Sequence, residues 1–188
     1  MEATGFVLAG GGSTRMGRDK ALLPYRGTTL VKYVAAAVEQ AAGRVVLIGD
    51  AKRYHGIGYP VYPDNVPPCG PMGGIYTALS VTATDWNLVV ACDMPMLSAP
   101  LLRSLLQQAS RTTAPCVAAA IGGRPEPLCA VYHRRCLPAL ARAIADHRFK
   151  MTRFLEDLQW DPVALGEPSA LANVNTPAEW AIFENPPA

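Results

Sequence analysis

Hydrophobic residues along the chain gather in short runs that glycine and proline separate. Three of these runs, at residues 5–9, 44–49 and 86–92, are almost continuously apolar, which is typical of strands buried on both faces of a sheet. Apolar residues recur at helical spacing over residues 30–42, and Gly43 follows as a stop signal. The chain is therefore predicted to begin with a strand, a helix and a second strand.

The alternation of strand and helix patterns continues to the end of the chain. Further strands are expected at 59–62, 116–123 and 127–133 and in the tail, and further helices at 75–81, after Ser98, and at 137–145, 152–158 and 177–183. This order favours an α/β fold, a three-layer sandwich in which helices cover both faces of a mostly parallel sheet. A length of 188 residues suits a single domain over 1–188.

Composition limits the function classes. Hydrophobic residues make up 50% and charged residues 17% of the chain, which is typical of a globular protein. The net charge of +2 is small for a nucleic-acid binder, and no apolar run approaches the roughly 20 residues that cross a bilayer. The first residues lack the basic segment of a secretory signal, and the five cysteines form no C-x-x-C pair. We expect a cytoplasmic protein with reduced thiols and without nucleic-acid or membrane partners.

Two predicted strand ends carry polar chemistry. The segment "GGGSTRMGRDK" at residues 10–20 follows the first strand, and Asp93 follows the strand at 86–92. Ligands of parallel sheets bind beyond such carboxyl ends. Glycines let backbone N–H groups approach an anion, and the hydroxyl, arginine and lysine side chains add donors and cations. The segment is predicted to hold phosphates; the alternative is a glycine turn with solvated basic residues.

Two familiar phosphate-binding motifs do not fit this segment. A P-loop requires lysine and then serine or threonine after its second glycine, whereas Arg18 and Asp19 follow Gly17. The dinucleotide fingerprint requires a third glycine at the position of Arg15. The prediction of phosphate binding therefore rests on the glycines, hydroxyls and cations of the segment and not on either of these motifs.

The stretch "LAGGGSTRMGRDK" at residues 8–20 resembles the glycine-rich loop of the molybdenum cofactor guanylyltransferase family. The likeness continues in "PDNVPPCGPMGGI", "VVACDMP", "RPEPLCAVY" and "NVNTPAEW", and so covers roughly residues 6–180. The resemblance implies a Rossmann-like nucleotidyltransferase that transfers GMP from magnesium-bound GTP to the terminal phosphate of molybdopterin and releases pyrophosphate. GTP and the molybdopterin cofactor are then the expected partners, together with cofactor-biosynthesis proteins or recipient molybdoenzymes.

The resemblance also implies roles for single residues. Asp93 would hold magnesium or manganese, while Lys20 and Arg15 would bind the β- and γ-phosphates and stabilise the leaving pyrophosphate. The nucleotide would be bound by Leu8, Ala9, Gly10, Gly11, Gly12 and Ser13, with Lys20, Asp64 and Asp93. Asp93 and Asp64 can also be read as turn residues. Where the family often has an asparagine after its second strand, this chain has Ile48, so that contact is lost, made by backbone or moved to Asp50.

Candidates for binding the anionic acceptor are the basic and amide residues Arg124, Arg148, Lys150, Arg153, Asn173 and Asn175. Two alternatives stay open. The basic residues around Arg148 also fit a solvated helix face, and Thr176 before Pro177 also fits a helix N-cap.

Three other functions fit parts of the pattern. A sister enzyme that uses CTP has L-A-A-G in place of Leu8 to Gly11, and the glycine at position 11 leaves room for a purine. A sugar-1-phosphate nucleotidyltransferase shares the early loop but not the NVNTP segment. A non-catalytic protein that delivers guanine nucleotide or finished cofactor would need neither Lys20 nor Asp93.

Overall fold

The computed structural model describes residues 1–10, 19–64, 66, 69–174 and 176–184. Seven strands form one sheet in the order β5-β4-β1-β6-β8-β7-β9. Their bounds are β1 (Ala3–Leu8), β4 (Val45–Ile48), β5 (Val61–Tyr62), β6 (Trp86–Ala91), β7 (Cys116–Ile121), β8 (Arg124–His133) and β9 (Asp161–Ala164). Only β8 runs antiparallel to its neighbours in this sheet. The predicted mostly parallel sheet is confirmed.

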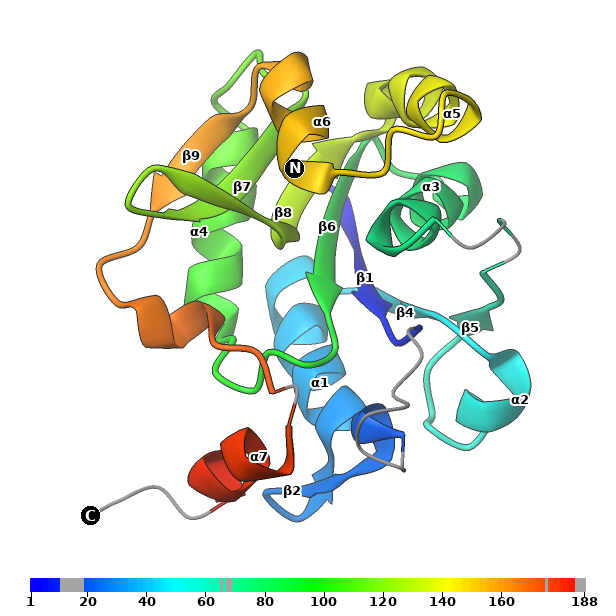
Figure 1. The fold of residues 1–188 in the computed structure, drawn as a ribbon, viewed down its shortest axis with the longest axis vertical. Helices are drawn as coiled ribbons and strands as arrows, with labels where there is room; N and C mark the ends of the chain where they lie inside the picture. Colours follow the sequence, from blue (N-terminus) through cyan, green and yellow to red (C-terminus); the bar gives the residue numbers. More distant parts are fainter. Residues whose placement is uncertain (11–18, 65, 67–68, 175, 185–188) are drawn as a thin grey trace.

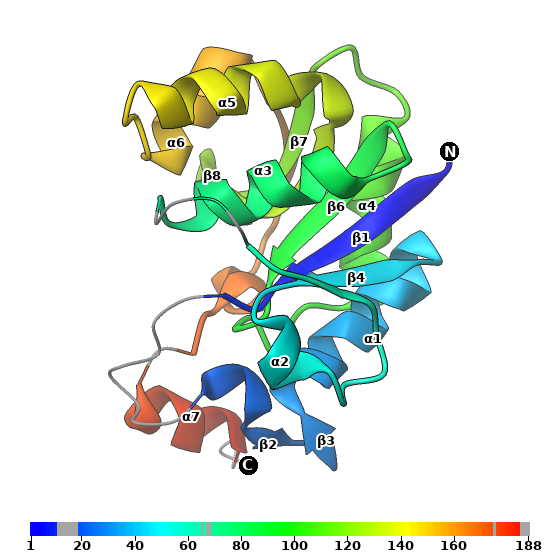
Figure 2. The ribbon, with the colours of Figure 1, turned by 90° about the vertical axis from the view of Figure 1, so that its right-hand side faces the viewer.

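Helices cover both faces of the sheet (Figures 1 and 2). One face carries α1 (Leu30–Ala42) and α4 (Ala99–Ala109), and the other carries α3 (Pro71–Val81), α5 (Leu137–Ala145) and α6 (Met151–Leu158). Successive side chains of a strand point to opposite faces, so in β1 Val7 joins the first core while Phe6 and Leu8 join the second. Both faces are buried, which explains the continuously apolar runs and confirms the three-layer sandwich.

Shorter elements gather at the end of the molecule toward which β1 and β6 run (Figures 1 and 2). They include the hairpin of β2 (Pro24–Tyr25) and β3 (Thr28–Thr29), α2 (Ala51–Tyr54) and α7 (Pro177–Glu184). The 3-10 turn η2 (Lys20–Leu22) also lies at this end, and η4 (Pro168–Leu171) precedes α7, whereas η3 (Arg134–Cys136) follows the antiparallel strand β8 and lies at the opposite end. The pattern of hydrophobic residues did not predict α2, β2 or β3, because elements of two to four residues are too short to show a hydrophobic period.

The helix α3 begins earlier than its sequence pattern predicts. The pattern predicts a start near residue 75, but the helix begins at Pro71 and includes Gly73 and Gly74, although glycine disfavours helix interiors. A Cβ on Gly74 would lie 3.1 Å from a methyl group of Leu8. The glycine therefore lets α3 pack closely on β1. By contrast, α1 spans its predicted residues and ends at Gly43, whose φ of 75° is the left-handed conformation that glycine favours.

Gly5→Ala is expected to destabilise the protein. A Cβ on Gly5 would lie 2.1 Å from Cγ1 of Val38 in α1 and 3.0 Å from the carbonyl oxygen of Arg44, so the helix and strand would have to separate. Overpacking of this kind costs about 1–3 kcal/mol of unfolding free energy. Urea unfolding of the two proteins would measure it. Gly56→Ala is the control, because a Cβ there meets nothing within 4 Å; equal urea midpoints for wild type and Gly5→Ala would contradict the prediction.

Candidate functional site

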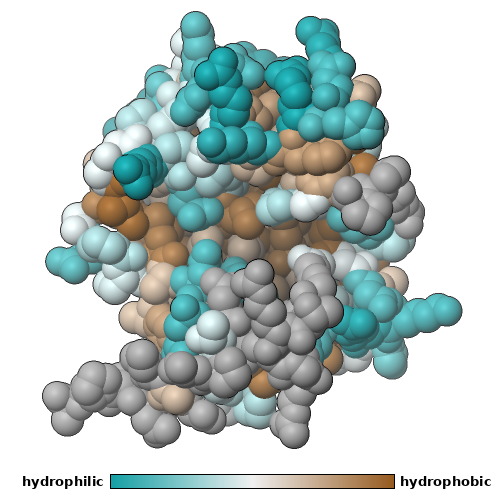
Figure 3. Space-filling model, viewed as in Figure 1, coloured by the Kyte–Doolittle hydropathy of each residue, from teal (hydrophilic) through white to brown (hydrophobic). Residues whose placement is uncertain are grey.

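The strands β1 and β6 end together at the carboxyl edge of the sheet. Their parallel register pairs Leu8 with Ala91, and the Cys92 N–H donates to the Leu8 carbonyl at 3.1 Å. Asp93 follows in a turn and caps no helix. Figure 3 shows that the face seen in Figure 1 is hollowed near its centre, where β6 ends. Asp93 therefore lies where ligands of parallel sheets bind.

The structure brings Lys20 and Asp93 together from positions 73 residues apart. Lys20 begins η2, and its Nζ lies 2.5 Å from Oδ2 of Asp93. The two side chains are only 21% and 14% exposed, so their attraction is screened less than that of a surface pair. A cation and a carboxylate thus meet at the edge of the sheet that the sequence singled out.

The second oxygen of Asp93 marks a place for a ligand. Oδ1 is buried and has no hydrogen-bond partner among the described residues. A buried carboxylate oxygen without a partner is costly, and a hard cation would satisfy it. The described residues contain no group of three or more histidine, cysteine, aspartate or glutamate side chains that could hold a metal. Asp93 therefore fits a magnesium ion that takes its remaining ligands from phosphates and water, as magnesium commonly does.

A second carboxylate that the sequence reasoning did not single out lies nearby. The antiparallel pairing of β6 with β8 extends to Val90 and Cys129, and Glu126 lies further along β8, close enough to Asp93 to feel its charge. Burial raises the pKa of Glu126, and the charge of Asp93 raises this pKa further, although the Leu128 N–H that Glu126 accepts at 3.1 Å lowers it. Glu126 therefore lies close enough to Asp93 for the charge of one carboxyl group to affect the other.

The structure describes only some of the residues that are predicted to line the nucleotide. Both backbone groups of Ala9 are bonded within the protein, because its N–H donates to the Ile48 carbonyl at 2.8 Å and its carbonyl accepts the Tyr54 hydroxyl at 2.7 Å. Gly10 is exposed, and a Cβ on it would meet nothing within 4 Å. Gly11, Gly12, Ser13 and Arg15 lie outside the described residues. Their roles stay predictions.

Asp64 lies beside the first turn of α3. Its Oδ1 accepts the Thr77 hydroxyl at 3.0 Å and the Val66 N–H at 3.4 Å. A Cβ on Gly73 would lie 3.3 Å from Oδ2, so this glycine also makes room for the carboxylate. The contact with Val66 is the one expected of a turn residue, while the exposed position leaves Asp64 accessible to a ligand.

The side chains of Ile48 and Asp50, at the end of the second strand, both have structural roles. Ile48 is 1% exposed and packs in the core, so its side chain cannot reach a nucleotide. Asp50 caps α2 instead: its Oδ1 accepts the N–H groups of Lys52 at 2.9 Å and Arg53 at 3.3 Å. Binding of a nucleotide by the Asp50 side chain would therefore compete with its capping of α2.

Several acceptor candidates already have ionic partners. Arg148 pairs with Asp146 at 3.2 Å and with Asp157 at 3.4 Å, and Arg153 pairs with Glu156 at 3.6 Å and with Asp157 at 3.3 Å. The two arginine side chains are 53% and 70% exposed. Arg153 lies on the solvated face of α6, whereas Arg148 lies in the loop between α5 and α6, so the helix-face alternative is wrong for Arg148. Arg124 and Lys150 are likewise exposed. Their roles in binding the acceptor stay predictions.

The NVNTP segment is tied to the site and also begins a helix. The Val174 N–H donates to the Asp93 carbonyl at 2.9 Å, which holds this segment against the end of β6. The Glu179 N–H donates to Oγ1 of Thr176 at 3.2 Å, and the Thr176 N–H donates to Oε2 of Glu179 at 2.9 Å. This reciprocal pair is a capping box, so the N-cap reading of Thr176 is confirmed. Asn173 is exposed, and Asn175 lies outside the described residues.

The fold and the site define a nucleotidyltransferase, and residues 5–163 match the family model described as the MobA-like NTP transferase domain. The chain is 38% identical to the molybdenum cofactor guanylyltransferase of Xanthomonas euvesicatoria pv. vesicatoria, over 97% of this chain and 96% of the relative. It is 33% identical to that of Serratia proteamaculans, over 93% and 90%. The chain therefore belongs to the molybdenum cofactor guanylyltransferase family.

Solved structures support the same fold. The molybdopterin-guanine dinucleotide biosynthesis protein A from Archaeoglobus fulgidus superposes with a TM-score of 0.80 at 23% identity, over 96% of each chain. In the part of the chain that the structure describes, no helix is long and apolar enough to cross a membrane.

Proposed function

We propose that this protein transfers GMP from magnesium-bound GTP to the terminal phosphate of molybdopterin, forming molybdopterin guanine dinucleotide. The observation that carries the proposal is the approach of Lys20 Nζ to within 2.5 Å of Asp93 Oδ2 at the carboxyl edge of the sheet. A magnesium triphosphate needs a carboxylate for its metal and a cation for its phosphates, side by side. The names of the relatives support the choice of GTP and of molybdopterin.

The reaction is a displacement at phosphorus. A phosphate oxygen of the acceptor attacks the α-phosphorus of GTP, a new P–O bond forms, and the bond to the β-phosphate oxygen breaks with its electrons leaving on pyrophosphate. Asp93 would hold magnesium or manganese, which supplies charge neutralisation at the phosphates when bound. Lys20, together with Arg15, would hold the β- and γ-phosphates and stabilise the charge of the leaving group. The protein forms no covalent bond, so its contribution is position and charge.

GTP is expected to bind at least tenfold more tightly than CTP, ATP or UTP, which corresponds to about 1.4 kcal/mol. Calorimetry with magnesium and each nucleotide in turn measures this preference. A preference for CTP would retain the chemistry of Asp93 and move the protein to the cytidylyl branch. Absence of binding to all four would contradict the proposal at its first step.

Measurement of pyrophosphate release distinguishes a transferase from a non-catalytic delivery protein. A transferase releases pyrophosphate only when GTP and molybdopterin are both present, whereas a delivery protein binds them and releases none. The pairing of Lys20 with Asp93 favours the transferase, since a carrier needs no cation to stabilise a leaving group.

The five cysteines are free and buried, which fits a reducing compartment, so we also propose that the reaction occurs in the cytoplasm.

A further inference from the structure

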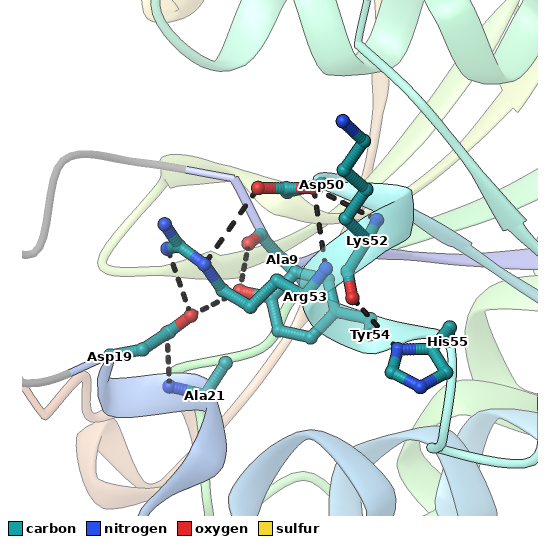
Figure 4. A network of polar contacts seen from close by, with 8 residues as sticks. All are labelled: Ala9, Asp19, Ala21, Asp50, Lys52, Arg53, Tyr54 and His55. Carbon is teal, nitrogen blue, oxygen red and sulfur yellow. Dashed lines mark hydrogen bonds and ion pairs between the residues drawn. The ribbon is translucent and has the colours of Figure 1, made fainter.

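A network of polar contacts connects the end of β4 with the residue before Lys20 (Figure 4). The short helix α2, capped by Asp50, directs two side chains at Asp19. The Tyr54 hydroxyl lies 2.8 Å from Oδ2 of Asp19, and Nη1 of Arg53 lies 3.1 Å from the same oxygen. Oδ1 of Asp19 accepts the Ala21 N–H at 3.0 Å. Three donors therefore fix the carboxylate next to Lys20.

The Tyr54 hydroxyl also reaches the other end of the glycine-rich segment. It lies 2.7 Å from the carbonyl oxygen of Ala9, the last residue before Gly10. Its single proton is thus directed at two acceptors, one at each end of residues 10–18. This hydroxyl joins the place where the segment leaves β1 to the place where it enters η2.

The surroundings of Tyr54 are built for this contact. The residue is 1% exposed. A Cβ on Gly49 would lie 2.9 Å from the Tyr54 ring and 3.3 Å from the backbone of Ala9, so the glycine makes room for the ring against β1. Burial and the hydrogen bond to Asp19 both raise the pKa of Tyr54, which keeps the hydroxyl protonated and able to donate.

We propose that Tyr54, acting through Asp19, is a positioning residue that sets Lys20 for the triphosphate. Asp19 is the N-cap of η2, and Lys20 is the first residue of that turn. A fixed Asp19 carboxylate therefore fixes the backbone from which Lys20 extends to Asp93. The inference rests on the proposed function, because it assigns Tyr54 of α2 to the same phosphate site.

The test is the affinity for a nucleoside triphosphate relative to its monophosphate, measured by calorimetry with magnesium. Tyr54→Phe removes one oxygen and retains the ring. It is expected to weaken triphosphate binding about tenfold while monophosphate binding changes less than twofold, since Lys20 is assigned to the β- and γ-phosphates. A merely structural role would lower the melting temperature and leave the ratio of the two affinities unchanged, which would overturn the inference.

Two further variants complete the design. Tyr59→Phe is the matched control, because the Tyr59 hydroxyl donates to exposed Glu39 at 3.3 Å and touches no part of the network. Asp19→Asn replaces the carboxylate that accepts the Tyr54 hydroxyl. It is expected to lower the affinity for the triphosphate relative to the monophosphate, and it tests the inference if Tyr54→Phe does not fold. The comparison uses whichever nucleoside triphosphate the wild type binds best. If the wild type does not prefer GTP, that result alone refutes the proposed function and leaves the role of Tyr54 open to this test. A wild type that binds no triphosphate overturns both.

Discussion

Asp93→Asn is expected to slow GMP transfer by about 100- to 1,000-fold, the effect typical of removing one group that neutralises charge in a transition state. Asparagine has nearly the shape of aspartate but no charge, so it would coordinate a divalent cation far more weakly. The same variant should therefore lose affinity for Mn²⁺ in the absence of nucleotide. Electron paramagnetic resonance of Mn²⁺ and the rate of pyrophosphate release measure the two effects separately.

The control for this variant is Asp85→Asn. Asp85 is an exposed residue just before β6, whereas Asp93 follows the opposite end of the same strand. The chemical change is identical, and both rate and metal affinity should stay near those of the wild type. If Asp93→Asn bound Mn²⁺ as the wild type does and still transferred GMP, a metal role for Asp93 would be wrong. Thermal unfolding of each variant separates these effects from loss of the fold.

The sequence predicts the parts of this site that depend on strong local patterns. Continuous apolar runs identify β1 and β6, and a parallel sheet brings their carboxyl ends together, so the position of Asp93 follows from the order of elements. Lys20 is identified by the motif that contains it. The sequence cannot predict the distance between Lys20 and Asp93, since that depends on where η2 lies relative to the end of β6.

Tyr54 and Glu126 show why the rest of the site needs the structure. Tyr54 is presented by a helix of four residues, which is too short to have a readable period, and its hydroxyl meets acceptors 45 and 35 positions away. Glu126 reaches the neighbourhood of Asp93 through the antiparallel register of β8, the one strand that reverses the direction of this sheet. In each case the position of the residue in the site depends on contacts between segments that are distant in the sequence, and the local sequence around the residue does not reveal it.

Lys20→Met is expected to change the affinities for two ligands in opposite directions. In the structure, Nζ of Lys20 lies 2.5 Å from Oδ2 of Asp93, so a cation bound at Oδ1 of the same carboxylate would be repelled by the neighbouring ammonium group. Removing the ammonium should tighten binding of Mn²⁺ alone by a few-fold, since a partly exposed ion pair contributes about 1 kcal/mol. The same change removes a charge from the phosphate site, so binding of magnesium-bound GTP should weaken, and transfer should slow by about 100-fold.

Lys20→Arg provides the matched control, because it retains a cation beside Asp93 while replacing a compact ammonium by a planar guanidinium. Its affinity for Mn²⁺ should stay close to that of the wild type, and its loss in GTP binding should be smaller than that of Lys20→Met. Parallel losses of Mn²⁺ and GTP affinity in Lys20→Met would instead mean that Lys20 holds Asp93 in place for the metal and does not repel it. The direction of the change in Mn²⁺ affinity thus distinguishes two roles of the ion pair. Tighter binding means that Lys20 opposes the metal at Asp93, and weaker binding means that Lys20 holds Asp93 in place for the metal.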